Sequence, residues 1–107
     1  MSALSTGGPI RDQLPAGLEA EGFDCLTRHA SGRELSGLLG QALNTACSTF
    51  LQDPSAENAA EVADLLKASC DHHSVAWAQV EEARQKLKEQ EGCYGDLLLE
   101  ALTRRPA

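Results

Sequence analysis

Residues 31–51 read SGRELSGLLGQALNTACSTFL, and this stretch decides the fold class. Its apolar side chains recur at intervals of three and four residues, which gathers them on one face of an α-helix. Ser31 and Glu34 have the spacing of a capping box, in which each side chain accepts a hydrogen bond from a backbone amide of the first turn. The stretch therefore predicts a helix that begins at Ser31 and ends near Leu51. Its apolar face consists of Leu35, Leu38, Leu39, Ala42, Leu43, Ala46 and Phe50.

A second helix is predicted directly after the first. Asp53 is suited to cap its N-terminus, and Pro54 is suited to its first position. The connection is short, so the two helices should lie antiparallel as a hairpin. The predicted apolar face of this helix consists of Ala59, Val62, Ala63, Leu66 and Cys70.

The third helix is predicted over residues 75–91. Helix propensity falls across Asp71–Ser74, which favours a break or kink there and makes Ser74 a candidate cap for the new helix. One continuous helix over 54–91 is the alternative, because the spacing of three and four residues persists through Leu66, Cys70, His73, Trp77 and Val80. Glu82 and Lys86 form a favourable pair four residues apart on the polar side. The expected inward side chains are Ala76, Trp77, Val80, Ala83 and Leu87.

The two ends of the chain are less regular than the middle. Residues 1–17 contain three glycines and two prolines without periodicity, which is typical of a flexible N-terminal arm. Residues 18–30 are expected to form a short helix or an ordered lead-in that Gly22 interrupts. Gly92 and Gly95 predict a helix stop and a turn. A last short helix is expected over 96–103, carrying Leu97, Leu98, Leu99 and Leu102.

Composition supports an all-α fold. Leucine and alanine dominate the apolar residues, whereas valine, isoleucine and aromatic residues, which sheets favour, are few. The prediction is a small helical bundle of three main helices plus one or two short ones, built as a single α-helical domain over 18–107 behind the N-terminal arm.

Charge and cysteine usage limit the classes of partner and compartment. The net charge of −7 disfavours binding to nucleic acid and to anionic membrane surfaces. The sequence contains neither a secretory signal nor an apolar run near the ~20 residues that span a bilayer. We therefore expect a cytoplasmic or nuclear protein. Its four cysteines, none in a C-x-x-C pair, should be reduced structural thiols.

Candidate catalytic and metal sites are incomplete in the sequence. Cys70, His72 and His73 have ligand types, but a structural zinc site needs four ligands and no second motif supplies the rest. Cys25 is followed by Arg28 and His29, a possible nucleophile and base, yet no oxyanion donors are evident. The sequence therefore predicts no enzyme activity and no cofactor. The acidic residues Glu57, Glu61 and Asp64 are interpreted as a solvated helix face.

Protein–protein interaction is the function that the sequence favours. Alanine-rich faces and four aromatic residues make a lean core, and lean small domains often gain stability by association. The expected role is a non-catalytic adaptor or small subunit of a larger complex, with another protein as partner and a homo-oligomer as an alternative. The alternative function is a thiol or metal sensor that uses Cys70, His72 and His73. The candidate interface residues are Trp77, Val80, Leu87, Leu97, Leu98, Leu99 and Leu102.

Overall fold

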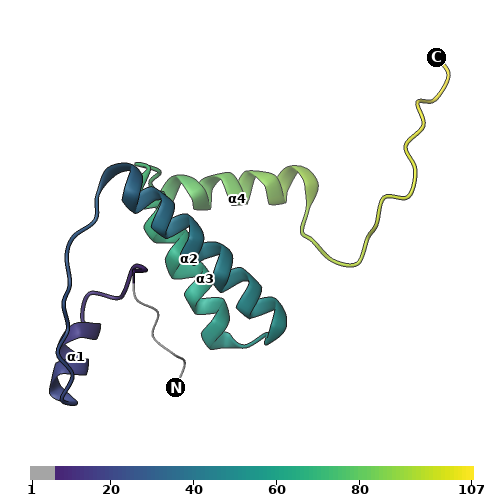
Figure 1. The fold of residues 1–107 in the computed structure, drawn as a ribbon. Helices are drawn as coiled ribbons and strands as arrows, with labels where there is room; N and C mark the ends of the chain where they lie inside the picture. The colour runs from purple at the N-terminus through teal and green to yellow at the C-terminus, as the bar shows by residue number, and fades with distance from the viewer. Residues whose placement is uncertain (1–6) are drawn as a thin grey trace. The chain divides into compact units, whose positions relative to one another are not determined.

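The computed structural model describes residues 7–107, and the described chain is all-α, as predicted (Figure 1). It contains three longer helices and a short one, with no strand in the described part. The helices are α1 (Leu14–Ala20), α2 (Gly32–Gln52), α3 (Ala56–His72) and α4 (Trp77–Glu91). The chain falls into two compact units, one that ends at Ala76 and one that spans Trp77–Ala107. The first six residues of the predicted arm lie outside the described part.

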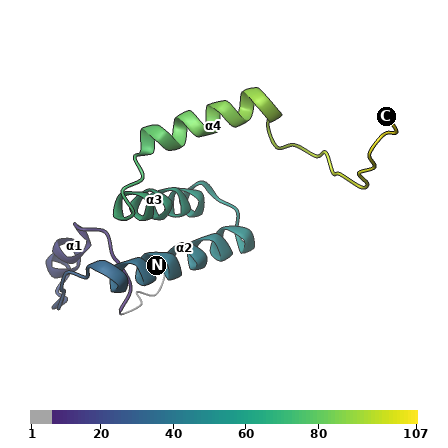
Figure 2. The same cartoon turned by 90° about the horizontal axis from the view of Figure 1, so that it is seen from above.

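Helices α2 and α3 form the predicted antiparallel hairpin, and they lie side by side in both views (Figures 1 and 2). Every residue of the predicted apolar face of α2 is at least partly buried. Leu39, near the middle of this face, is the one apolar residue of the described part that is buried, with 7% of its surface exposed. The hairpin therefore has a small core centred on Leu39.

The start of α2 differs from the predicted capping box. Ser31 is the N-cap residue with extended backbone, but its side chain makes no capping hydrogen bond. Instead, the Arg28 guanidinium donates two hydrogen bonds, of 2.8 and 2.7 Å, to the two carboxylate oxygens of Glu34. The capping box prediction is wrong because a guanidinium matches the carboxylate with two charge-assisted hydrogen bonds, a stronger pairing than one with a backbone amide.

The start of α3 also differs from the prediction. Ser55, not Asp53, is the N-cap, and its hydroxyl accepts a 3.1 Å hydrogen bond from the Asn58 backbone amide. Asp53 is the C-cap residue that follows α2, and its carbonyl accepts a 2.8 Å hydrogen bond from the Asn58 side-chain amide. Asn58 thus links the end of one helix to the beginning of the next. Pro54 belongs to the connection rather than to the first turn of α3.

The apolar face of α3 is rotated relative to the prediction. Leu65 is partly buried, whereas Leu66 is 41% exposed and counts as exposed, as do Ala59 and Ala63. Val62 and Cys70 belong to both the predicted and the observed face. Adjacent residues point about 100° apart on a helix. A predicted face that includes Leu66 instead of Leu65 is therefore rotated about the helix axis relative to the observed one. The partly buried residues within α3 are Asn58, Val62, Leu65, Ala68, Ser69, Cys70 and His72.

The predicted break after α3 is confirmed, and the alternative of one continuous helix is wrong. The Val75 amide bonds to the Cys70 carbonyl at 2.8 Å, and the Ser74 amide bonds to the Asp71 carbonyl at 3.2 Å. This pair of hydrogen bonds is the Schellman motif, which places one residue in the left-handed conformation. Ser74 occupies that position with φ of 59°. Ser74 therefore completes the turn that ends α3, and α4 begins three residues later, at Trp77.

The segment before α2 contains a helix that begins earlier than expected. Helix α1 starts at Leu14, inside the predicted arm, with Pro15 in its first turn where the missing amide costs nothing. Gly22 (φ 99°) ends it, and the Phe23 amide bonds to the Leu18 carbonyl at 3.0 Å. Residues 23–30 contain no helix. Gly22, which was expected to interrupt a helix within residues 18–30, instead terminates α1.

The second unit contains α4 and an irregular tail. Helix α4 begins at Trp77, two residues later than predicted, and ends before Gly92, which has φ of 83° as a helix-terminating glycine. The predicted short helix over 96–103 is wrong, because residues 92–107 contain no helix. Isolated helices this short are marginal unless packing supports an apolar face. No helix in residues 7–107 has the length and apolar character to cross a bilayer.

Candidate functional site

The predicted interface residues all lie in the Trp77–Ala107 unit. Trp77 and Val80, one turn apart on α4, are partly buried, and Leu87 two turns further along is exposed. The spacing of three and seven residues places them on one side of α4. Helix α4 thus contributes an apolar strip that ends in an exposed leucine.

The four predicted C-terminal leucines are exposed. The exposed fractions are 99% for Leu97, 76% for Leu98, 73% for Leu99 and 88% for Leu102. Tyr94 is also fully exposed. The structure does not bring these side chains together into a helix face, because the backbone over residues 92–107 is not helical. An exposed group of large apolar side chains is a common mark of an interaction site.

Two ion pairs lie on the exposed surface of α4. The Arg84 guanidinium donates hydrogen bonds of 2.7 and 2.9 Å to the Glu81 carboxylate, and the predicted pair of Glu82 and Lys86 is confirmed at 3.5 Å. Such pairs between residues three or four apart stabilise an exposed helix modestly.

His72 and His73 connect the end of α3 to the beginning of α2. The His72 Nε2 atom lies 3.1 Å from the Gly32 carbonyl oxygen, so this nitrogen donates. The His73 Nε2 atom lies 3.3 Å from the Ser36 hydroxyl. The two rings meet edge to face, with centroids 5.0 Å apart. Both histidines are therefore engaged in closing the open end of the hairpin.

The alternative function, a thiol or metal sensor, would need several ligand side chains close together, and the described residues do not bring such a group together. Cys70 is a partly buried free thiol, and residues 7–107 contain no cluster of three or more ligand-type side chains placed to hold an ion. The other free thiols are Cys25 and Cys47, which are partly buried, and Cys93, which is exposed.

The contacts of Cys25 and Arg28 differ from the nucleophile and base pair that the sequence suggested around Cys25. The Cys25 thiol lies 3.9 Å from the Pro15 carbonyl, where it donates a weak hydrogen bond. Arg28 is committed to Glu34, and their mutual hydrogen bonds and charge raise the pKa of Arg28 and lower the pKa of Glu34. These contacts fasten the lead-in to the first turn of α2.

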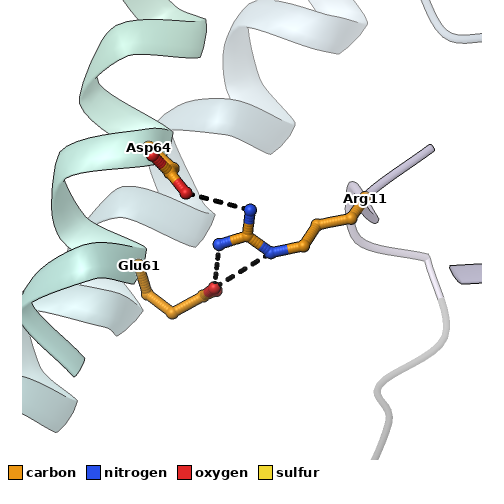
Figure 3. Close-up of polar contacts among 3 residues, drawn as sticks. All are labelled: Arg11, Glu61 and Asp64. Carbon is orange, nitrogen blue, oxygen red and sulfur yellow. Dashed lines mark hydrogen bonds and ion pairs between the residues drawn. The ribbon is translucent and has the colours of Figure 1, made fainter. Parts of the chain in front are cut away.

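Arg11 makes a contact that the sequence did not predict (Figure 3). Its guanidinium reaches α3, where the Nε atom and a second nitrogen bond to one oxygen of Glu61, at 3.1 Å for Nε. Its Nη1 atom lies 2.9 Å from Asp64. These carboxylates raise the pKa of Arg11. Glu61 and Asp64 are thus not simply solvated, although an isolated arginine and two acids three residues apart give no sequence signal strong enough to pair them.

No known protein family, curated protein or solved structure matches this chain.

Proposed function

We propose that the chain is a non-catalytic protein–protein interaction module, an adaptor or small subunit of a larger complex, that binds its partner through the Trp77–Ala107 unit. The observation that supports this proposal is the exposure of Leu97, Leu98, Leu99 and Leu102 outside any helix. Removing large apolar side chains from water is favourable, and we propose that a partner protein buries these leucines. The proposal places the chain in the cytoplasm or nucleus, where its free thiols would stay reduced.

The energetics suggest that the leucines bind together with other side chains. Fully burying four leucines contributes ~6–12 kcal/mol. Fixing the backbone of the seven residues from Leu97 to Thr103 costs about the same, ~7–14 kcal/mol. The segment therefore gains little from ordering alone, and Tyr94 and the apolar strip of α4 must add contact area. A partner with a groove that accepts an apolar helix fits this requirement.

The experiment compares the intact chain with two multiple variants. The tagged chain is used to capture stoichiometric companions from its own cell extract. The test variant replaces Leu97, Leu98, Leu99 and Leu102 with serine. The control variant replaces Leu26 and Leu51 with serine, because both leucines are also exposed but lie in the first unit. We expect the companion to be lost from the test variant and kept by the control.

Two results would contradict the proposal. A companion that the test variant still captures in full amount would show that these leucines do not form the interface. A chain that captures no companion and is a monomer by light scattering would argue against an interaction module. A dimer that dissociates in the test variant would identify a second copy of the chain as the partner.

A further inference from the structure

A groove of about 950 Å³ lies along the α2–α3 hairpin, in the first unit. The groove is lined both by the hairpin and by the chain's own residues 7–11 and Leu14. The leucines and alanines that the hairpin contributes are Leu38, Leu39, Ala42, Ala46, Leu65 and Ala68. Glu61 and Asp64 of α3 also line it, so that two carboxylates border an apolar surface. This combination suits a segment that carries one apolar side chain beside one cation.

A segment of the chain itself, Gly7–Arg11, lies at this groove. Pro9 is partly buried there, Ile10 is half-exposed, and Arg11 binds Glu61 and Asp64 with its guanidinium (Figure 3). The guanidinium contacts one carboxylate through two nitrogens and the other through a third, an arrangement that a lysine could not reproduce. Arg11 therefore shows that the two carboxylates at the groove bind a guanidinium.

We infer that this groove is a docking site for an extended segment of a partner protein that presents an arginine beside an apolar residue, and that Gly7–Arg11 is its intramolecular competitor. This inference goes beyond the proposed function, which concerns the Trp77–Ala107 unit. Charge complementarity identifies the partner segment as basic, because both carboxylates at the groove and the net charge of −7 attract cations.

The structure also allows the competitor to leave. Arg11 and its two acidic partners are largely exposed, with side-chain exposures between 51 and 59%, so an incoming guanidinium can replace Arg11 without uncovering a buried charge. Residues 7–11 contain no helix and precede α1, so this segment can change its path without unfolding a helix. Displacement would leave α2 and α3 in place.

The test uses a fluorescent peptide with the sequence of residues 7–14, GGPIRDQL, blocked at both ends. Its binding to the intact chain and to the full-length Arg11→Ala variant is followed by anisotropy. We expect the variant to bind it on the order of tenfold more tightly, because the intramolecular competitor is removed. A peptide with glutamine in place of arginine should bind the same variant on the order of tenfold more weakly.

A matched pair of substitutions locates the site on α3. In the Arg11→Ala background, Glu61→Gln with Asp64→Asn should abolish the preference for arginine, whereas Glu57→Gln should preserve it, because Glu57 lies on the same helix outside the groove. Far-ultraviolet circular dichroism confirms that each variant keeps its helices. Equal binding of the arginine and glutamine peptides, or no effect of the Glu61 and Asp64 substitutions, would overturn the inference. A dimer of the intact chain that these substitutions dissociate would also overturn it, because the occupant would be a second copy.

The C-terminal variants separate this inference from the proposed function. Serine at Leu97, Leu98, Leu99 and Leu102 should leave peptide binding unchanged, since none of these residues lines the groove. Loss of peptide binding in that variant would contradict the inference that the groove binds independently of the C-terminal leucines.

Discussion

Ser55 and Ser31 hold equivalent positions before α3 and α2, but only one of them uses its hydroxyl. The Ser55 hydroxyl accepts a hydrogen bond from the Asn58 amide, whereas the Ser31 side chain makes no such bond. Replacing Ser55 with alanine should lower the free energy of unfolding by about 1 kcal/mol. Ser31→Ala should cost clearly less. Urea unfolding of the two variants measures the difference, and equal losses would contradict the assignment of Ser55 as the active cap.

Glu34 gives the stability of the hairpin a predictable dependence on pH. Its hydrogen bonds with Arg28 lower its pKa in the folded chain, so unfolding raises the affinity of this carboxylate for a proton. The stabilisation is complete above the ordinary glutamate pKa of about 4.3 and is lost as the pH falls through the lower folded pKa. Removing Arg28 should remove this contribution.

The measurement compares the melting temperatures of the intact chain and Arg28→Gln at a series of pH values from about 6 down to about 3. The two curves should converge as the pH falls. In a Glu34→Gln background the Arg28 substitution should have no pH-dependent effect in this range. Curves that stay parallel through the acid range would rule out a stabilising pair of Arg28 and Glu34.

At the scale of helices, the end of α3 contains a residue in an unfavourable conformation. Ser74 has φ of 59° and completes the Schellman motif, a position where a side chain meets steric resistance and glycine does not. Ser74→Gly should therefore raise the free energy of unfolding by about 1 kcal/mol, after the extra freedom of glycine in the unfolded chain is counted. The control is Ser69→Gly within α3, which should lower it by a similar amount. A destabilising Ser74→Gly would contradict the proposed strain.

Leu39 tests how much the α2–α3 packing depends on one side chain. It is the buried residue of the hairpin, whereas Leu51 on the same helix is 77% exposed. Leu39→Ala should cost about 2–4 kcal/mol through lost burial and a cavity. Leu51→Ala should change stability by less than about 0.5 kcal/mol. Thermal melting followed by helicity distinguishes them, and similar melting temperatures would show that Leu39 is not the centre of the core.

The sequence predicted the helices well where the apolar pattern has one solution. In α2 every leucine and alanine except Leu51 lies on one face, and the burial of that face matches the prediction. In α3 two adjacent leucines, Leu65 and Leu66, support two faces about 100° apart, and only packing against α2 selects Leu65. Helix starts were harder. Asp53 and Ser55 are both suitable caps for α3, and only Ser55 accepts the Asn58 amide. At α2 the Glu34 carboxylate binds Arg28 instead of completing a capping box.

The candidate sites were predictable to different degrees. The leucines of the tail were identified from composition, but the expected helix over 96–103 does not form in the chain alone, since nothing in the sequence states whether packing supports it. The pairing of Arg11 with Glu61 and Asp64 joins residues about fifty positions apart. A single sequence contains no periodic signal for a contact of that separation.

For the whole molecule, division into two units predicts two ranges of local stability. Backbone amides at residues 93–107 are outside any helix and should exchange with deuterium at nearly the rate of an unfolded chain. Amides in the middle of α2, around Leu39, should exchange slowest. Hydrogen exchange followed by mass spectrometry measures both. Protection of Leu97–Leu102 in the isolated monomeric chain would contradict the described tail.

The exposure of Cys93 has a consequence for any study of self-association. This thiol lies outside the helices, next to Gly92 and the fully exposed Tyr94. Nothing in its immediate neighbourhood shields it from a sulfur on another molecule, so handling in air would join two chains covalently through this position. Such a species would run as a dimer on a sizing column without any recognition between surfaces. Only the assembly that persists in a thiol reductant, or in Cys93→Ser, reports on noncovalent affinity.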